Sequence, residues 1–308
     1  MNSVYTTTIT RAARARGLRV TVLDSSQPIF ELRRGREAVR CYNALTDRVG
    51  AATFFLANHK HAANQFLRCN GFSVPAQLKF SDFAAAEKFL ARHKPIVVKP
   101  CMQWGGRGVA VDVRTPAELR AAVLRAQTFE DEVVLEQCVS GEDQRLILVG
   151  GNYVAAIRRT PATITGDGRR TVAQLIRRQN RVACAEDPSH RIPLDAETRR
   201  QLARLGHRLT DVPRDGERVQ VRLTSNYHTG GDAAVITDEV TPQLRRVAQR
   251  VAKLFGLPMV GIDFLVDARR GKFWIIEVSP DLAISPPEGD TVVEFFLDHL
   301  FPGSRRQP

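Results

Sequence analysis

The spacing of hydrophobic positions along the chain predicts a mixture of helices and strands. Apolar residues that recur every three to four positions predict helices, and apolar runs or strict alternation predict strands. The predicted helices are a first one that ends at Gly17, those at 60–70, 116–126, 242–255 and 291–300, and a helical excursion over 187–209. The predicted strands are 18–23, 29–32, 96–99, 109–113, 133–136 and 218–223, followed by a hairpin over 261–279. Elements mixed in this order predict an α+β fold rather than a doubly wound parallel sheet.

The predicted hairpin over 261–279 places two carboxylates on one face. Side chains alternate along a strand, so a turn around 268–271 would bring Asp263 and Glu277 opposite each other. Like charges that face each other across a strand pair repel, and apolar neighbours leave little water to screen them, so a positive group is expected between them. Two carboxylates and the Ser279 hydroxyl are hard oxygen ligands of the kind that Mg²⁺ prefers. The alternative is an ordinary hairpin with one carboxylate on a solvated face.

A glycine-rich segment follows the predicted strand 96–99. Lys99 ends that strand, and Gly105, Gly106 and Gly108 come shortly after it. Glycines leave backbone N–H groups unobstructed, so such a loop can hydrogen-bond phosphate oxygens while a nearby lysine supplies charge. The segment is not a P-loop, because Val109 follows the last glycine where that motif needs lysine. A tight hairpin turn is the alternative interpretation.

Two polar segments lie further along the chain. Strand 133–136 runs into a connector that contains Gln137, Val139 and Asp143. Strand backbone at a cleft can hydrogen-bond an adenine edge, and a carboxylate just beyond can bind ribose hydroxyls. The loop 225–232 concentrates hydroxyls, an amide and paired glycines, as a phosphate or substrate contact would require. Each segment alone is equally consistent with a strand end or a surface turn. The support for a nucleotide site comes from the order of the segments along the chain: lysine, glycine loop, strand with carboxylates, polar loop and hairpin.

Composition narrows the class of protein. The chain has 308 residues, of which 43% are hydrophobic, enough for a sizeable core and roughly two lobes. No apolar run approaches the length of a membrane span, and the N-terminus lacks the apolar core of a signal peptide. The five cysteines show no CxxC spacing, so neither a zinc site nor a disulfide framework is predicted. A cytoplasmic protein is expected.

The formal net charge of +12 raises the hypothesis of nucleic-acid binding. The arginine pairs, however, fall in different predicted elements, and no basic strand interleaved with aromatic residues is present. A basic balance also suits an enzyme that binds nucleotide phosphates and acidic substrates, because a positive cleft raises their local concentration.

Several short blocks occur in an order that resembles the ATP-grasp ligases. They lie at 97–100, 105–109, 134–136, 141–145, 154–162, 166–168, 229–232, 237–239, 261–263 and 276–278. Within that superfamily the chain is similar to the branch that contains the cyanophycin synthetase ATP-grasp domain and the glutathione-synthetase half of the bifunctional glutathione enzyme. The resemblance covers roughly 58–301. It implies an ATP-grasp fold, two α+β lobes that clasp ATP, over 58–308, with the lid lobe at about 95–150 and a short α/β preface over 1–57.

The resemblance also implies roles for individual residues, each matched by position. Lys60 and Lys99 would bind phosphates, and Gly105, Gly106 and Gly108 would form the lid over the β- and γ-phosphates. The predicted nucleotide contacts are completed by Glu136, Gln137 and Val139 for adenine and Asp143 for ribose. The predicted magnesium ligands are Asp263, Glu277 and Ser279, and the predicted catalytic contacts to substrate or phosphate are Arg158 and Asn226.

The chain departs from the family pattern at two places. The family usually has asparagine where this chain has Ser279, and a hydroxyl is a shorter and poorer ligand than an amide carbonyl. A second magnesium would therefore bind weakly. The glycine expected shortly afterwards is replaced within 280–283, which changes the acceptor side of the predicted pocket.

The predicted function is that of an ADP-forming carboxylate-amine ligase that uses ATP and Mg²⁺. It would form an amide or peptide bond on a small amino acid or peptide through an acyl phosphate. The predicted partners are a small carboxylate and a small amine, with no nucleic acid and no membrane, and whether the chain forms a homo-oligomer stays open. Two alternatives remain: a catalytically weakened nucleotide-binding subunit, suggested by Ser279, and a basic nucleic-acid-binding protein, suggested by the net charge.

Overall fold

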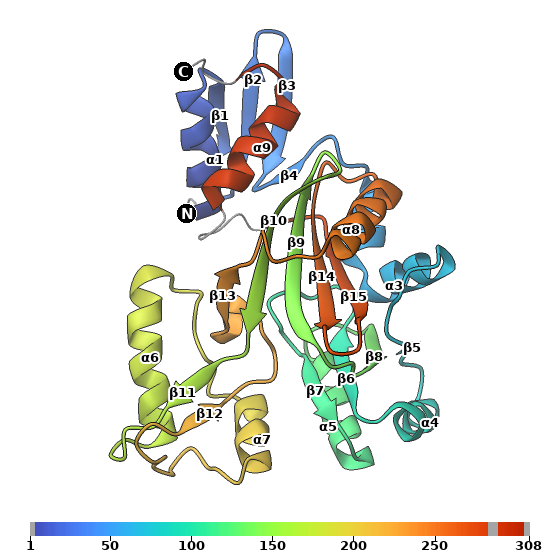
Figure 1. Ribbon diagram of the computed structural model, residues 1–308, viewed down its shortest axis with the longest axis vertical. Helices are drawn as coiled ribbons and strands as arrows, with labels where there is room; N and C mark the ends of the chain where they lie inside the picture. Colours follow the sequence, from blue (N-terminus) through green and yellow to red (C-terminus); the bar gives the residue numbers. More distant parts are fainter. Residues whose placement is uncertain (1–3, 283–288, 305–308) are drawn as a thin grey trace. The chain divides into compact units, whose positions relative to one another are not determined.

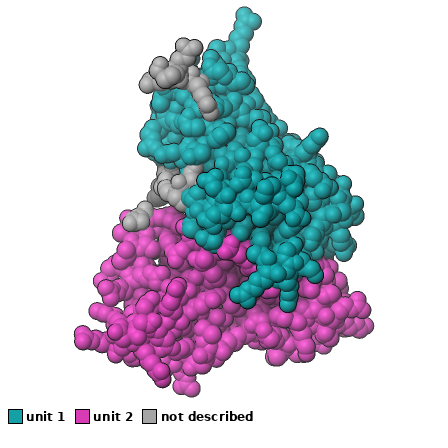
Figure 2. Space-filling view, in the orientation of Figure 1, with its two compact units in different colours: residues 1–74, 144–158, 234–308 teal, residues 75–143, 159–233 magenta. Residues whose placement is uncertain are grey.

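The computed structural model describes residues 4–282 and 289–304 (Figure 1). The chain divides into two compact units, each assembled from segments that are distant in sequence (Figure 2). Unit 1 comprises residues 1–74, 144–158 and 234–308, and unit 2 comprises residues 75–143 and 159–233. The first 57 residues thus share a compact unit with C-terminal segments, and the predicted division into 1–57 and 58–308, with a lid lobe at 95–150, stays a prediction.

A small antiparallel sheet lies at the N-terminal end of unit 1. Its strands are β1 (Arg19–Asp24), β2 (Ile29–Arg34), β3 (Glu37–Tyr42) and β4 (Leu45–Thr46), in that spatial order. Alternation along β2 buries Phe30 and Leu32 but not their neighbours. These two side chains form a core with α1 (Val4–Ala15) and α9 (Gly289–Leu300), which lie beside the sheet in Figure 1. The first and last described helices are thereby joined in one core.

A five-stranded sheet carries the hairpin that the sequence predicts. Its spatial order is β13 (Asp232–Val235), β10 (Asn152–Thr160), β9 (Glu142–Val149), β14 (Met259–Asp267) and β15 (Lys272–Ser279). The core of unit 1 beside it includes residues of α2 (Ala51–Asn58), α3 (Lys60–Cys69) and α8 (Pro242–Phe255). α8 begins at the Thr241 cap with proline in its first turn and ends at left-handed Gly256, so its predicted bounds are confirmed.

Unit 2 contains a four-stranded sheet covered by two helices. Its order is β5 (Gln77–Lys79), β8 (Val133–Gln137), β6 (Ile96–Pro100) and β7 (Ala110–Val113), and every pairing is antiparallel. α4 (Phe83–His93) and α5 (Pro116–Gln127) contribute buried residues to one core with these strands. A capping box between Thr115 and Glu118 begins α5 where the sequence predicts it.

The remaining part of unit 2 differs from the helix predicted over 187–209. It contains α6 (Val172–Glu186), α7 (Ala196–Arg204), the short helix η1 (Tyr227–Thr229) and a ribbon of β11 (Thr163–Thr165) and β12 (Arg218–Gln220). The predicted helix over 187–209 is wrong for 187–195, where two prolines interrupt the chain, and only α7 is helical in that range. α6 was not predicted, although its capping box between Thr171 and Gln174 is a readable helix start.

The helices of the described chain are short. α6 has 15 residues and α8 has 14, whereas a bilayer crossing requires about 20 apolar residues. None of the helices within 4–282 and 289–304 is long and apolar enough to span a membrane.

Candidate functional site

The β14–β15 hairpin places two carboxylates directly opposite each other. Asp263 pairs with Glu277, and Gly261 pairs with Ser279 two positions away. The register shifts immediately after Asp263, so a bulge separates this pair from the rest of the ladder. The predicted hairpin and its facing carboxylates are confirmed, while the role of these groups as metal ligands stays a prediction.

Two cations of unit 1 neutralise this carboxylate pair. Arg145 donates from Nε to Asp263 Oδ1 at 2.6 Å and from Nη2 to Asp263 Oδ2 at 2.9 Å. Lys60 Nζ lies 3.3 Å from Glu277 Oε1. Asp263 is only 3% exposed, and a buried carboxylate needs such partners because burial without them is costly. The positive group that the sequence analysis expected is thus chiefly Arg145.

Arg145 is not among the residues that were predicted from the sequence to form the site. It lies in β9, which is the neighbour of β14 in the sheet, and 118 residues separate it from Asp263. Its Nη2 also lies 3.5 Å from Ser279 Oγ, so one side chain reaches two of the three predicted metal ligands. The available signal was the polar start of a strand that becomes apolar after Arg145, since residues 146–149 are all buried.

Helix α3 fixes the position of Lys60. His59 caps this helix by accepting a hydrogen bond from the Ala62 amide at Nδ1, and Lys60 is the first helical residue. Phe66, on the same helix, packs edge-on against Phe255 of α8 with ring centroids 5.3 Å apart. Lys60 is consequently buried at the hairpin rather than free in solvent, in agreement with its predicted place before a helix.

Unit 2 holds the second predicted lysine in a buried ion pair. Lys99 Nζ lies 2.8 Å from Glu136 Oε1, and the two side chains are 7% and 4% exposed. Gln77 donates to the other oxygen of Glu136. The Glu136 carboxylate therefore orients Lys99, and a contact between Glu136 and adenine stays a prediction.

The glycine-rich segment connects β6 and β7. Gly105, Gly106 and Gly108 have φ angles of 71°, 72° and 69°, a region that other residues rarely adopt. A Cβ on Gly108 would lie 2.8 Å from the Pro100 side chain, whereas a Cβ on Gly106 would meet nothing closer than Thr229 Cγ2 at 3.4 Å. Gly108 is thus required by packing, and Gly105 and Gly106 by the backbone conformation. The hairpin turn and the phosphate loop are compatible interpretations of this segment.

The predicted catalytic residue Asn226 lies beside this glycine loop. Its Oδ1 accepts a hydrogen bond from the His228 amide and so caps η1. Its Cβ is the next nearest atom to the position where a Cβ of Gly106 would lie, at 3.7 Å. The structure brings Asn226 and the glycines together within unit 2. A contact between Asn226 and substrate stays a prediction.

The predicted adenine and ribose positions have specific partners. The amides of Gln137 and Cys138 donate to the Ala76 and Pro95 carbonyls, so these two amides are engaged within unit 2. The adenine contacts predicted for Glu136, Gln137 and Val139 stay a prediction. The Asp143 carboxylate accepts two hydrogen bonds at Oδ1 from Arg159, at 3.0 and 2.7 Å. A ribose contact at Asp143 stays a prediction.

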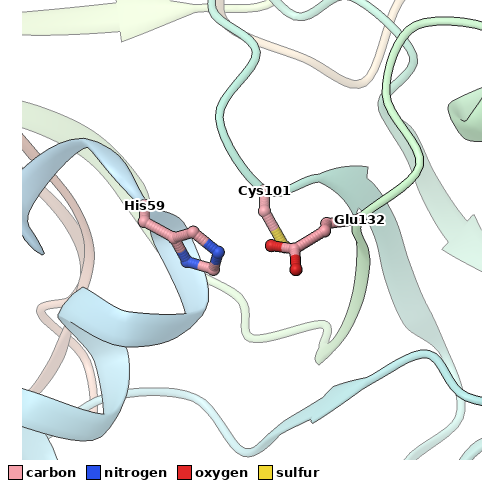
Figure 3. Close-up of side chains that lie close together, drawn as sticks. All are labelled: His59, Cys101 and Glu132. Atoms are coloured by element: carbon pink, nitrogen blue, oxygen red, sulfur yellow. The ribbon is translucent and has the colours of Figure 1, made fainter. Parts of the chain in front are cut away.

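Two further polar groups complete the description. Arg158, the other predicted catalytic residue, lies on β10 with Nη1 3.5 Å from Glu239 Oε2. Figure 3 shows Cys101 and Glu132 side by side in unit 2, where the Cys101 amide also donates to the Glu132 carbonyl. His59, drawn with them, belongs to unit 1 and serves there as the cap of α3.

Comparison with known sequences supports the resemblance. Residues 63–187 match the ATP-grasp domain of prokaryotic glutathione synthetase. The chain is 31% identical to cyanophycin synthetase of Nostoc sp. over 97% of its own length and 35% of that protein. It is 29% identical to the bifunctional glutathione biosynthesis protein of Mannheimia succiniciproducens over 82% of its own length and 34% of that protein. The chain thus spans about a third of the length of these curated relatives.

Solved structures show the same fold. A bifunctional glutathione synthetase from Pasteurella multocida superposes with a TM-score of 0.65 at 22% identity, over 98% of this chain and 43% of that one. The D-alanine–D-alanine ligase from Bacillus anthracis superposes with a TM-score of 0.52 at 14% identity, over 80% of this chain and 67% of that one. The predicted α+β ATP-grasp fold is confirmed, and the chain is similar to ATP-grasp proteins over most of its length.

Proposed function

We propose that this protein is an ATP-dependent carboxylate-amine ligase that forms an amide or peptide bond on a small amino acid or peptide. The observation that carries the proposal is the facing pair Asp263 and Glu277, held by Arg145 and Lys60 in unit 1. Unit 2 adds Lys99 and a loop of left-handed glycines. These are the groups that phosphoryl transfer requires, because that reaction depends on positioning and on neutralising negative charge. The similarity to cyanophycin synthetase and to the bifunctional glutathione biosynthesis protein supports the same proposal.

The donor set of the hairpin fits a hard divalent cation. Asp263, Glu277 and Ser279 offer carboxylate and hydroxyl oxygens on one face, which is the ligand chemistry that magnesium prefers. Arg145 contacts both Asp263 oxygens, but each carboxylate oxygen has a second lone pair for a metal. When bound, Mg²⁺ would supply counter-charge to the nucleotide phosphates.

The proposed reaction has two steps. A substrate carboxylate oxygen forms a bond to the γ-phosphorus of ATP, and ADP leaves. The amine nitrogen then attacks the acyl carbon, inorganic phosphate leaves and the nitrogen gives up a proton. Lys60 and Lys99 would hold phosphate oxygens in place, and the glycine loop would donate N–H groups while it keeps water from the acyl phosphate. Arg158 and Asn226 are proposed contacts to substrate or phosphate.

A screen of ADP release tests this proposal. Purified protein is incubated with ATP, Mg²⁺ and pairs drawn from amino acids and small peptides, and new products are identified by mass. We expect ADP and an amide product from at least one pair. A folded Glu277→Gln variant should lose both, because the phosphates lose counter-charge. Undiminished ADP release by that variant would contradict the assignment of the hairpin.

Ser279 motivates the second candidate, a nucleotide-binding subunit with weakened catalysis. A hydroxyl reaches less far than the amide that the family usually has at this position. If Ser279 is a poor ligand, Ser279→Asn should lower the Mg²⁺ concentration that gives half-maximal turnover and leave the folded state unchanged. Nucleotide binding with no turnover on any pair, in both the natural protein and Ser279→Asn, would favour the subunit.

A further inference from the structure

Unit 1 contains a cavity that the proposed reaction does not use. Its volume is about 730 Å³, and it lies between α8, the turn that joins β9 to β10, and the end of α9. The basic groups on its wall are Arg246, Arg250 and Lys253 of α8 and His299 of α9. No aspartate or glutamate is among the described residues that line it. The neighbourhood of the cavity therefore carries a concentration of positive charge.

Three of the four cations of helix α8 line this cavity in a row. Arg246, Arg250 and Lys253 are exposed and follow a spacing of four and three residues, which places them on one helix face. At 1.5 Å per residue the row extends about 10 Å along the helix axis. The helix sequence itself contains four cations and no carboxylate. Self-repulsion of this kind is relieved when an anion binds along the row.

The fourth cation of α8, Arg245, has a structural role instead. Arg245 is half-buried and donates to the Val240 carbonyl at 3.0 Å and the Thr237 carbonyl at 2.9 Å. Its guanidinium also lies 4.8 Å from the centre of the Tyr153 ring. Arg245 thus fixes the start of α8, whereas its neighbour Arg246 faces the cavity.

On the opposite wall of the cavity, Gly150 lies against the His299 side chain. Gly150 has a φ of 57°, and a Cβ added to it would lie 2.6 Å from His299 Nδ1. The strand turn and the histidine therefore approach each other as only glycine permits, and His299 is fixed at the cavity wall. Ala252, Leu257 and Pro258 add an apolar part to the lining.

We propose that this cavity binds a small, multiply charged anion, such as a molecule with two or more phosphate or carboxylate groups. Guanidinium groups bind both kinds of oxyanion through charge-assisted hydrogen bonds, and a row of cations matches charges spaced along one molecule. The proposal is independent of the ligase reaction, since the carboxylate pair and the glycine loop take no part in it.

The test uses inorganic tripolyphosphate with chelator present, so that nucleotide and magnesium are excluded. Calorimetric titration compares the natural protein with Arg246→Gln/Lys253→Gln and with Gln249→Glu, which places a carboxylate in the lining. Gln249→Leu is the uncharged control at that position. Arg14→Gln/Arg36→Gln removes two exposed charges of the same unit outside the lining. Lys99→Ala reports any binding at the proposed nucleotide site. Citrate in place of tripolyphosphate distinguishes carboxylate from phosphate ligands.

We expect both charge variants in the lining to lower the affinity by about tenfold or more. Arg246→Gln/Lys253→Gln loses charge-assisted hydrogen bonds, each worth about that factor, and Gln249→Glu places a like charge beside the anion. The controls and Lys99→Ala should retain the natural affinity. The NMR signals of His299 should shift on titration, because a bound anion favours the imidazolium. Absence of binding to the natural protein, equal binding by the variants and the natural protein, or loss of binding in Lys99→Ala alone would overturn the proposal.

Discussion

At the scale of single residues, Arg145 and Asp263 form a bidentate ion pair with little access to solvent. Their side chains are 20% and 5% exposed. Removing one partner of such a pair leaves a buried charge without compensation. The pair therefore influences both the stability of the hairpin and the charge that the hairpin presents to a ligand.

Arg145→Met should lower the free energy of unfolding by about 3–5 kcal/mol, because Asp263 stays buried and loses its counter-ion. The double variant Arg145→Met/Asp263→Asn should recover much of this loss, since no charge then stays buried. Chemical denaturation measures both values. Arg40→Met is the control, because Arg40 is 65% exposed in its pair with Glu31 and should contribute less than about 1 kcal/mol. Additive effects of the two buried substitutions would contradict the coupling.

At the scale of elements, the glycine loop between β6 and β7 has a left-handed backbone that glycine adopts without strain, and a Cβ on Gly106 would have room. Gly106→Ala should slow ligase turnover, because the added methyl group holds the loop backbone away from a phosphate. The matched control is Gly17→Ala, which has a φ of 75°, close to the 72° of Gly106, and no neighbour within 4 Å. Both variants should lose about 1–2 kcal/mol of stability from the left-handed backbone. Equal turnover in the two variants would remove the loop from the catalytic site.

The start of α6 gives an element-scale dependence on pH. Hydrogen bonds from the Arg170 backbone and side chain, and then from the Arg169 amide, lower the pKa of Asp167 to about 2. The ordinary value is 3.8. The stabilisation is therefore complete above the unfolded-state pKa and is lost as pH falls through the folded-state pKa. Asp167→Asn should make the unfolding midpoint less sensitive to pH between 4 and 2. Identical pH profiles for the two proteins would contradict this role.

Elements with a local signal could be predicted from the sequence. α8 has a capping threonine, a proline in its first turn and a glycine at its end, and the 261–279 hairpin has two largely apolar runs on either side of a polar turn. The β9–β10 pair was not predicted as strands, although residues 146–149 and 154–157 are apolar runs of the kind that buried strands show. The bidentate partner of Asp263 could not be identified either, because sheet order rather than sequence brings Arg145 beside it.

At the scale of the whole molecule, the 45 lysines and arginines that give the chain its basic character have different roles. Arg145 and Lys60 neutralise the hairpin carboxylates, and Lys99 pairs with Glu136. Arg200 and Arg204 of α7 bind Glu118 of α5 and thereby join two helices of unit 2. These five cations are thus engaged in ion pairs within each unit, and their charge is not available to a nucleic acid.

Nucleotide turnover and nucleic-acid binding can be measured separately, and together they distinguish a ligase from a basic nucleic-acid-binding protein. The ligase should release ADP rather than AMP, and only when both a carboxylate and an amine are present, because the acyl phosphate must form and then be consumed. A nucleic-acid-binding protein of the same charge should bind duplex or single strands with a steep dependence on salt and no dependence on amine. We expect at most weak binding to nucleic acid that disappears near physiological salt, since the arginine pairs of the sequence fall in separate elements and cannot all face one groove. ADP release with substrate pairs and fluorescence anisotropy with labelled oligonucleotides across a salt series measure the two behaviours. Sequence-selective binding at physiological salt, together with no nucleotide turnover on any substrate pair, would replace the ligase by a nucleic-acid-binding function.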